Sequence, residues 1–156
     1  MRAVVMVVPR EHDSRAETAM EDHMNATEII RAYYDAFNRR DMDAFFDLLD
    51  DNVIHDVNQG AREIGKEAFR HFMGDMNAAY KEELHDMVIF TNEDGTRAAA
   101  EFQLTGTYTD TAEGFPEAHG QSYTLLVGAF FEIRDGKITR VTNYYNVNDW
   151  LRQVRG

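Results

Sequence analysis

The chain of 156 residues has no cysteine. Disulfide bonds, thiolate nucleophiles and cysteine-ligated zinc or iron–sulfur centres are therefore excluded, and a reducing cytoplasm is the location we expect. Long apolar runs are missing too. The early stretch VVMVV, residues 4–8, is far shorter than the roughly 20 residues that a membrane-spanning helix needs. We expect no membrane association.

Basic residues are scarce. Lys and Arg together number 16 against 28 Asp and Glu, which gives a formal net charge of −12. Nucleic acid and anionic lipid are both bound through Lys and Arg side chains that neutralise phosphate. We therefore expect no nucleic-acid partner.

Several catalytic motifs are absent as well. The six histidines are scattered and form no H-x-H or H-E-x-x-H array that would hold a metal ion. No G-x-S-x-G elbow, P-loop or G-x-G-x-x-G is present, so a serine elbow, nucleoside triphosphate use and a Rossmann site lack their usual markers. We predict neither a metal nor a cofactor.

We expect the chain to divide into an N-terminal extension, residues 1–23, and one domain, residues 24–156. Apolar residues at helical spacing predict three helices in the first half of this domain. The first begins near Thr27, the second opens at Asp41 and is closed by Asp50-Asp51, and the third covers about residues 66–79. A strand over residues 53–57 separates the second helix from the third.

After Tyr80 the apolar spacing changes to the two-residue period of strands, and two Asp-Gly pairs predict tight hairpins. The predicted strands cover residues 83–91, 97–109, 122–134 and 137–147. A loop with the sequence DTAEGFPEAHGQ joins the middle two and has a length typical of a lid or rim. A half-turn, NDWLRQV, closes the chain. Helices followed by a meander predict an α+β fold with the helices on one face of an antiparallel sheet.

The strand over residues 122–134 is apolar on both faces. Alternation places one set together: Tyr123, Leu125, Val127, Ala129, Phe131 and Ile133. Leu126 and Phe130 make the opposite face apolar as well. Because the helices can cover only one face, we predict that a second copy of the chain covers the other in a two-fold homodimer.

The stretch VIHDVNQG, residues 53–60, carries the most concentrated polar chemistry. His55 and Asp56 are adjacent on a strand and must point to opposite faces. His55 shares its face with Val53 and Val57, so alternation favours His55 as the inward residue. An imidazole on the wall of an apolar pocket is a candidate proton carrier, although a core histidine held by a hydrogen bond is the alternative.

Three phrases carry a family resemblance: AYYDAFNRRDMDAFFDLLDDNVIHD, GKEAFRHF and FFEIRDGKITRVTNYYNV. Over about residues 27–150 the chain resembles the nuclear transport factor 2-like superfamily, and most of all its branch of ketosteroid isomerases and SnoaL-like polyketide cyclases. The resemblance implies a cone in which a curved antiparallel sheet is wrapped by three N-terminal helices around an internal apolar pocket. A shared fold fixes chemistry less firmly than it fixes architecture.

The resemblance also implies roles for particular residues. A tyrosine that stabilises an enolate oxygen corresponds to Tyr33, five residues before Asn38. The catalytic base corresponds to Asp56 when counted from the acidic pair, whereas counting without a gap puts Val57 there and makes His55 the neighbouring pocket residue. The second oxyanion donor of the isomerases, a protonated Asp, has no counterpart here, since residues 127–130 read VGAF.

Other candidates for binding a substrate are Tyr108, Tyr123, Tyr144 and Asn146. The leading hypothesis is a cofactor-free isomerase or cyclase that transfers a proton on a small hydrophobic carbonyl compound, with His55 or Asp56 moving the proton. Tyr33, with Tyr108 or Tyr144, would then stabilise the oxyanion. The alternative is a non-catalytic module of the same fold that binds a small ligand or dimerises. An epoxide hydrolase is the third choice, because no Arg can be placed between two inward acids.

Overall fold

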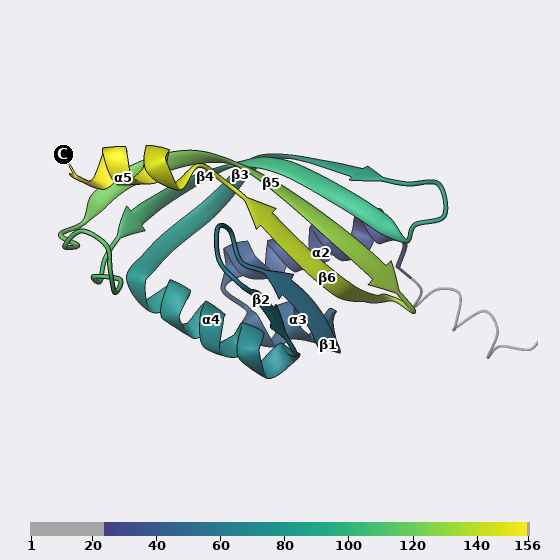
Figure 1. The fold of residues 1–156 in the computed structure, drawn as a ribbon. Helices are drawn as coiled ribbons and strands as arrows, with labels where there is room; N and C mark the ends of the chain where they lie inside the picture. Colours follow the sequence, from purple (N-terminus) through teal and green to yellow (C-terminus); the bar gives the residue numbers. More distant parts are fainter. Residues whose placement is uncertain (1–23, 156) are drawn as a thin grey trace, which may run out of the picture.

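Helices precede most of the sheet along the chain (Figure 1). The computed structural model describes residues 24–155, so the predicted extension, residues 1–23, lies outside the described residues. The elements are α2 (Ala26–Arg39), α3 (Met42–Asp47), β1 (Leu49–Asp56), β2 (Arg62–Ile64), α4 (Lys66–Ala79), β3 (Tyr80–Thr91), β4 (Arg97–Tyr108), β5 (Gln121–Arg134), β6 (Lys137–Tyr144) and α5 (Val147–Arg155).

Helix α2 is defined at both ends by its own sequence. The Asn25 side chain accepts the backbone N–H of Glu28 at 2.9 Å, and Arg40 ends the helix in the left-handed conformation with φ 58°. Asn38 then fixes the helix to the sheet, because its side-chain amide pairs with the backbone N–H and C=O of Leu84 at 3.0 and 3.2 Å. This anchor aims the apolar face of α2 at the sheet.

The strands form one open sheet in the order β2-β1-β6-β5-β4-β3. Strands β3 to β6 make the predicted antiparallel meander, whereas β1 runs parallel to β6. The sheet is therefore mixed, where a wholly antiparallel one was expected. Alternation in a sequence shows which face a residue takes, but it carries no signal for the direction of a pairing between distant segments. The α+β architecture itself is confirmed.

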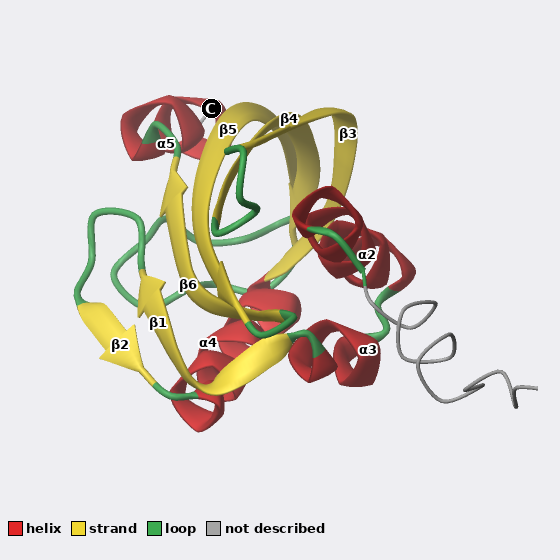
Figure 2. Cartoon of the chain, turned by 90° about the vertical axis from the view of Figure 1, so that its right-hand side faces the viewer, coloured by secondary structure: helices red, strands yellow, loops and turns green. Residues whose placement is uncertain are grey.

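The sheet curls, and α2, α3 and α4 lie along its concave side (Figure 2). On β5 the set that begins with Tyr123 is buried, whereas Leu126 is 67% and Phe130 47% exposed on the convex side. Phe90 and Tyr144, 60% and 59% exposed, add to the exposed apolar side chains. The alternation predicted for β5 is thus confirmed, and the homodimer inferred from it stays a prediction.

Several boundaries differ from those predicted. Strand β1 contains the acidic pair Asp50-Asp51, which was expected to close a helix, and β3 begins at Tyr80 rather than at residue 83. The expected C-terminal half-turn is a full helix, α5, which buries Trp150 and Val154. Burial of these apolar side chains stabilises a helix too short to be stable alone. Among the described helices, none has the length and apolarity needed to cross a membrane.

Candidate functional site

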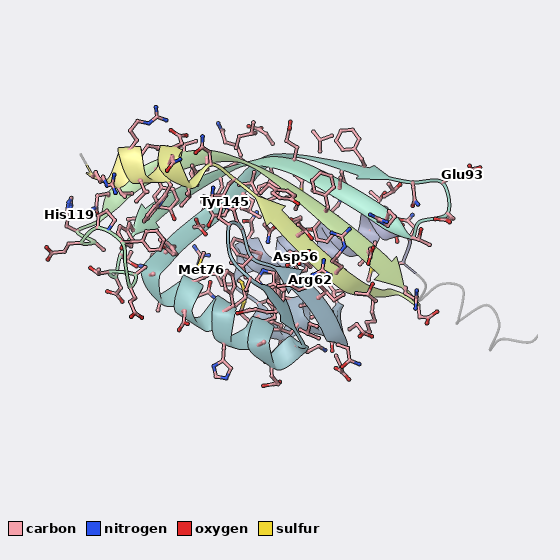
Figure 3. All side chains as sticks on the ribbon, in the orientation of Figure 1. Asp56, Arg62, Met76, Glu93, His119 and Tyr145 are labelled. Carbon is pink, nitrogen blue, oxygen red and sulfur yellow. The ribbon has the colours of Figure 1, made fainter. Side chains whose placement is uncertain are left out.

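Two adjacent hollows lie between the helices and the inner face of the sheet. The inner chamber, of about 120 Å³, is walled mainly by apolar side chains that include Phe45, Phe69, Phe72, Phe102 and Val127. The outer chamber, of about 360 Å³, continues to Trp150 and Leu151 of α5 and shares with the inner one Val57, Asn58, Phe72, Met76, Glu82, Leu104 and Tyr145. Met76 and Tyr145 mark this shared region in Figure 3. An apolar hollow with a few polar groups is typical of small-ligand sites.

His55 lies in the wall of the inner chamber. Strand β1 turns it inward, where the residue is 1% exposed. Its ring stacks on Phe69 at 4.0 Å between centroids and contacts Phe72 in a T-shaped arrangement at 4.6 Å. Burial lowers the pKa of the imidazole from 6.5 to about 4, although the negative charge of Asp56 opposes this. His55 is therefore neutral at physiological pH and able to accept a proton.

Glu63 faces His55 from the neighbouring strand. The two residues are direct cross-strand partners of β1 and β2, and Nδ1 of His55 lies 3.8 Å from Oε2 of Glu63. This distance is too long for a hydrogen bond. Both atoms are buried, and neither has a hydrogen-bond partner among the described residues. A carboxylate at this place can orient the imidazole and stabilise its protonated form. Strand β2 has three residues, too few for a periodic pattern, so this pair could not be predicted from the sequence.

Asp56 points to the opposite face of β1. Its carboxylate accepts hydrogen bonds from Arg62 Nε at 2.6 Å, Arg62 Nη2 at 3.1 Å and the Thr142 hydroxyl at 2.6 Å. The Arg62 hydrogen bond, with that of Thr142, holds the pKa of Asp56 below its usual value. Asp56 and Arg62 lie side by side on the sheet (Figure 3), and neither lines the two chambers. The alternation of β1 thus places His55, and not Asp56, at the cavity.

Two tyrosines of α2 line the inner chamber. Tyr33, predicted as an oxyanion donor, stacks on Phe45 at 4.3 Å between centroids. The hydroxyl of its neighbour Tyr34 is buried and has no hydrogen-bond partner in the described part of the chain. Burial raises the pKa of both phenols, so they stay protonated and can donate. Tyr34 was not singled out from the sequence, although it shares the apolar face of α2.

Tyr108 lies outside both chambers. Its hydroxyl donates to the Pro116 carbonyl at 2.7 Å and accepts from the Ala112 N–H at 2.8 Å. These bonds tie the loop over residues 109–120 to the end of β4, which is a structural role. Phe115 of that loop packs edge-on against Trp150 and lines the outer chamber, so the loop forms part of its rim.

Of the remaining predicted binding residues, Tyr123 lines a chamber, whereas Tyr144 and Asn146 do not. Tyr123 lines the outer chamber, as does Tyr145, which also reaches the inner one. Tyr144 lies outside the chambers, against Phe130 at 5.9 Å between centroids. The Asn146 side chain accepts the backbone N–H of Asp149 in the first turn of α5 and lines neither chamber.

Glu82 of β3 lines both chambers and was missed at the sequence level. Its Oε2 accepts a hydrogen bond of 2.7 Å from the Tyr123 hydroxyl. Burial raises the pKa of the Glu82 carboxyl, while the Tyr123 bond and the positive charge of Arg40 oppose this. A signal existed, because Glu82 has the same strand parity as the buried Leu84. The predicted strand began one residue too late to include it.

A broader depression of about 850 Å³ lies between the start of α2 and the β3–β4 and β5–β6 turns. It shares no lining residue with the two chambers. Within residues 24–155 no three His, Asp or Glu side chains are grouped so that they could hold a metal ion. The unpartnered polar groups of the inner chamber make that chamber the stronger candidate site.

The sequence profile of the SnoaL-like domain family matches residues 30–141. The chain belongs to this family. A solved candidate polyketide cyclase from Pseudomonas putida KT2440 is 57% identical with a TM-score of 0.83, over 84% of this SnoaL-like chain and 98% of its own. Another from Xanthomonas campestris pv. campestris is 53% identical with a TM-score of 0.81, over 83% and 96%. No curated protein matches the chain.

A more distant structure shares the SnoaL-like fold alone. An epoxide hydrolase from M. tuberculosis, described as LEH-like, is 18% identical with a TM-score of 0.63, over 86% of this chain and 92% of its own. At this identity the likeness extends to architecture and not to chemistry.

Proposed function

We propose that this SnoaL-like protein is a cofactor-free isomerase or cyclase that transfers a proton on a small hydrophobic carbonyl compound. One observation carries the proposal: the neutral imidazole of His55 stands in the wall of an apolar chamber that is also lined by Tyr34, whose hydroxyl has no partner among the described residues. Buried polar groups without partners are rare in folded proteins and are costly unless a ligand completes them. The candidate polyketide cyclases at 57% and 53% identity support the same class of reaction.

The reaction begins at the carbon next to the carbonyl group. Nδ1 of His55 faces Glu63, which leaves Nε2 to accept the proton. The electrons of the broken C–H bond form the enolate, whose oxygen accepts a hydrogen bond from Tyr34 or Tyr33. The imidazolium then returns its proton to another carbon of the conjugated enolate, which completes an isomerisation. In a cyclisation the enolate carbon instead attacks a second carbonyl, and the resulting alkoxide takes the proton.

Glu63 supports this cycle without touching the substrate. Protonation of His55 places a positive charge 3.8 Å from the Glu63 carboxylate, and the attraction between them stabilises the imidazolium. Catalytic hydrogen bonds that are long in a free enzyme often shorten in its complex with substrate. Glu63 is therefore a positioning residue that raises the basicity of His55 when the site is occupied.

The second candidate is a non-catalytic module that holds a small apolar ligand in the same chambers. The low basicity of a buried imidazole with a pKa of about 4 favours this reading. An epoxide hydrolase ranks third, since Asp56 and Arg62 pair away from both chambers.

A homodimer through the convex face of the sheet, and a cytoplasmic location, belong to the same proposal. The exposed side chains Phe90, Leu126, Phe130 and Tyr144 support the dimer, because a second copy would cover them. Nothing in the proposed proton transfer requires the second copy.

Deuterium exchange tests the proposed chemistry without knowledge of the natural substrate. The probe is 2-tetralone in D₂O, whose α-hydrogens are followed by NMR with and without protein. We expect protein-dependent exchange that falls about 100-fold or more in His55→Gln, the usual range for loss of a general base. His85→Gln is the matched control, since His85 lies on β3 with its ring bonded to Thr105 and lines neither chamber. Equal exchange in His55→Gln and in the wild type would show that His55 does not move the proton.

A further inference from the structure

Three residues on neighbouring strands form a transverse row on the inner face of the sheet. Gly106 of β4 pairs with Glu82 of β3 on one side and with Tyr123 of β5 on the other. The Tyr123 ring extends across Gly106, and its hydroxyl donates to Oε2 of Glu82 at 2.7 Å. A side chain on β5 thus reaches a carboxylate two strands away.

Gly106 makes this contact possible. A Cβ atom at that position would lie 2.3 Å from Cζ, 2.4 Å from the hydroxyl oxygen and 2.6 Å from Cε2 of Tyr123. Folded proteins do not tolerate such distances, so any side chain here would displace the end of the Tyr123 ring. The missing side chain leaves the room in which the Tyr123–Glu82 hydrogen bond forms.

The row lies where the two chambers meet. Glu82 lines both of them, and Tyr123 lines the outer one. Oε2 of Glu82 is occupied by Tyr123, whereas Oε1 has no hydrogen-bond partner among the described residues. Arg40 donates to the backbone carbonyl of Glu82 at 3.2 Å and lends positive charge to this part of the wall. One carboxylate oxygen is therefore held in place while the other remains free to accept.

We infer that Glu82, held by Tyr123 across Gly106, forms a polar subsite that accepts a hydrogen bond from a phenol or enol hydroxyl of the ligand. The apolar remainder of the ligand occupies the two adjoining chambers, of about 120 and 360 Å³, so the substrate class is a fused-ring or otherwise extended aromatic compound with at least one such hydroxyl. An apolar ligand of the same shape leaves Oε1 desolvated and without a partner, which costs binding energy. The inference rests on the proposed function only in placing the ligand in the same chambers.

A matched pair of ligands tests the subsite through binding alone. The affinities of 2-naphthol and 2-methylnaphthalene, which differ by a hydroxyl in place of a methyl group, are measured by calorimetry at neutral pH. We expect the wild type to prefer 2-naphthol by about tenfold or more, the usual effect of a hydrogen bond to a charged group. Glu82→Leu removes the preference and keeps the affinity for 2-methylnaphthalene, which also shows that the variant is folded.

Two further variants complete the design. Gly106→Ala should displace the Tyr123 ring and so reduce the preference for 2-naphthol, although the Glu82 side chain itself is unchanged. Glu83→Gln, an exposed neighbour on the same strand, leaves the preference unchanged. His55→Gln should keep the preference for 2-naphthol but lose the deuterium exchange of 2-tetralone. The two experiments therefore test the subsite and the proposed proton transfer independently. Absence of a preference in the wild type, or its persistence in Glu82→Leu, would overturn the inference.

Discussion

The two faces of the sheet differ in whether their polar side chains have hydrogen-bond partners. On the outer face Asp56, Arg62, Thr142, Arg140 and Glu132 form a continuous set of hydrogen bonds and ion pairs. On the side of the sheet that the helices cover, His55 Nδ1, Glu63 Oε2 and the Tyr34 hydroxyl have no partner within the described chain. Groups that are already paired stabilise a fold but have little left to offer a ligand, whereas buried unpaired groups cost stability and remain able to form new hydrogen bonds when a ligand binds. His55 and Asp56 are adjacent on one strand, yet His55 lies at the candidate site and Asp56 stabilises the outer face.

The largest effect we expect is on acid stability. The pKa of His55 is about 4 in the fold against 6.5 when unfolded, so between these values the unfolded chain binds the proton and the folded chain does not. Stability therefore falls as pH drops from 6.5 to 4, by about 3 kcal/mol from this residue. Urea unfolding of wild type and His55→Leu at pH 7.5 and 4.5 measures it. The difference between the two proteins should shift in favour of His55→Leu at the lower pH, and a constant difference would contradict the neutral imidazole.

Removing the Asp56–Arg62 ion pair of the outer face should lower the stability of the fold by less than protonation of His55 does. Asp56→Asn weakens the bidentate contact with Arg62 and the bond from Thr142, which we expect to lower the free energy of unfolding by about 1–2 kcal/mol. The loss should shrink as pH falls toward the pKa of Asp56, because protonation of the wild-type carboxylate weakens the same contacts. Denaturation midpoints of wild type and Asp56→Asn, measured from neutral pH down toward the pKa of Asp56, test this expectation. A stability of Asp56→Asn equal to wild type at neutral pH would refute the structural role.

Substitution of Glu63 should have a smaller effect, which acts specifically on the exchange rate and on the pKa of His55. Glu63→Gln should reduce deuterium exchange of 2-tetralone by about tenfold, as is usual for groups that orient a catalytic imidazole. It should also lower the pKa of His55 in the complex, measured by NMR titration with the probe bound. Glu67→Gln, at an exposed residue in the first turn of α4, is the control. A change in stability without a change in the His55 titration would mean that Glu63 is only structural.

The exposed apolar side chains of the convex face, Phe90, Leu126, Phe130 and Tyr144, should matter least for the stability of the protomer. Leu126→Lys alters a side chain that is 67% exposed, so protomer stability should change by less than about 0.5 kcal/mol. If the sheet face pairs two copies, the same change shifts the molar mass from dimer to monomer in light scattering. A monomeric wild type, or a dimer that survives the substitution, would remove the proposed interface.

The sequence was most informative where a regular pattern reports burial directly. Alternation on β5 separated its two faces correctly, helical spacing located α4 at about residues 66–79, and the parity of residues 53–57 favoured His55 as the inward residue. Each of these depends on local periodicity, which the packed structure preserves.

Residues that depend on irregular or distant structure were missed or misplaced. Glu63 lies on a strand of three residues, too short for a periodic pattern, and meets His55 only through the β1–β2 pairing. On β3 the register shifts between His85 and Val88, where Asp86 has φ 54°, so one parity does not hold along the strand. The roles of Tyr108 and Tyr144 depend on which groups the folded chain brings to them, and no alternation reveals that.

Whether the proton transfer belongs to the inner face of the sheet is tested by comparing His55→Gln and Asp56→Asn in the same exchange assay with 2-tetralone. Because only the first lies at the inner chamber, His55→Gln should lose about 100-fold or more of the protein-dependent rate. Asp56→Asn should stay within about threefold of wild type when assayed where it is folded, since it is the structural member of the pair. Loss of exchange in Asp56→Asn with retention in His55→Gln would contradict the assignment of chemistry to the inner face.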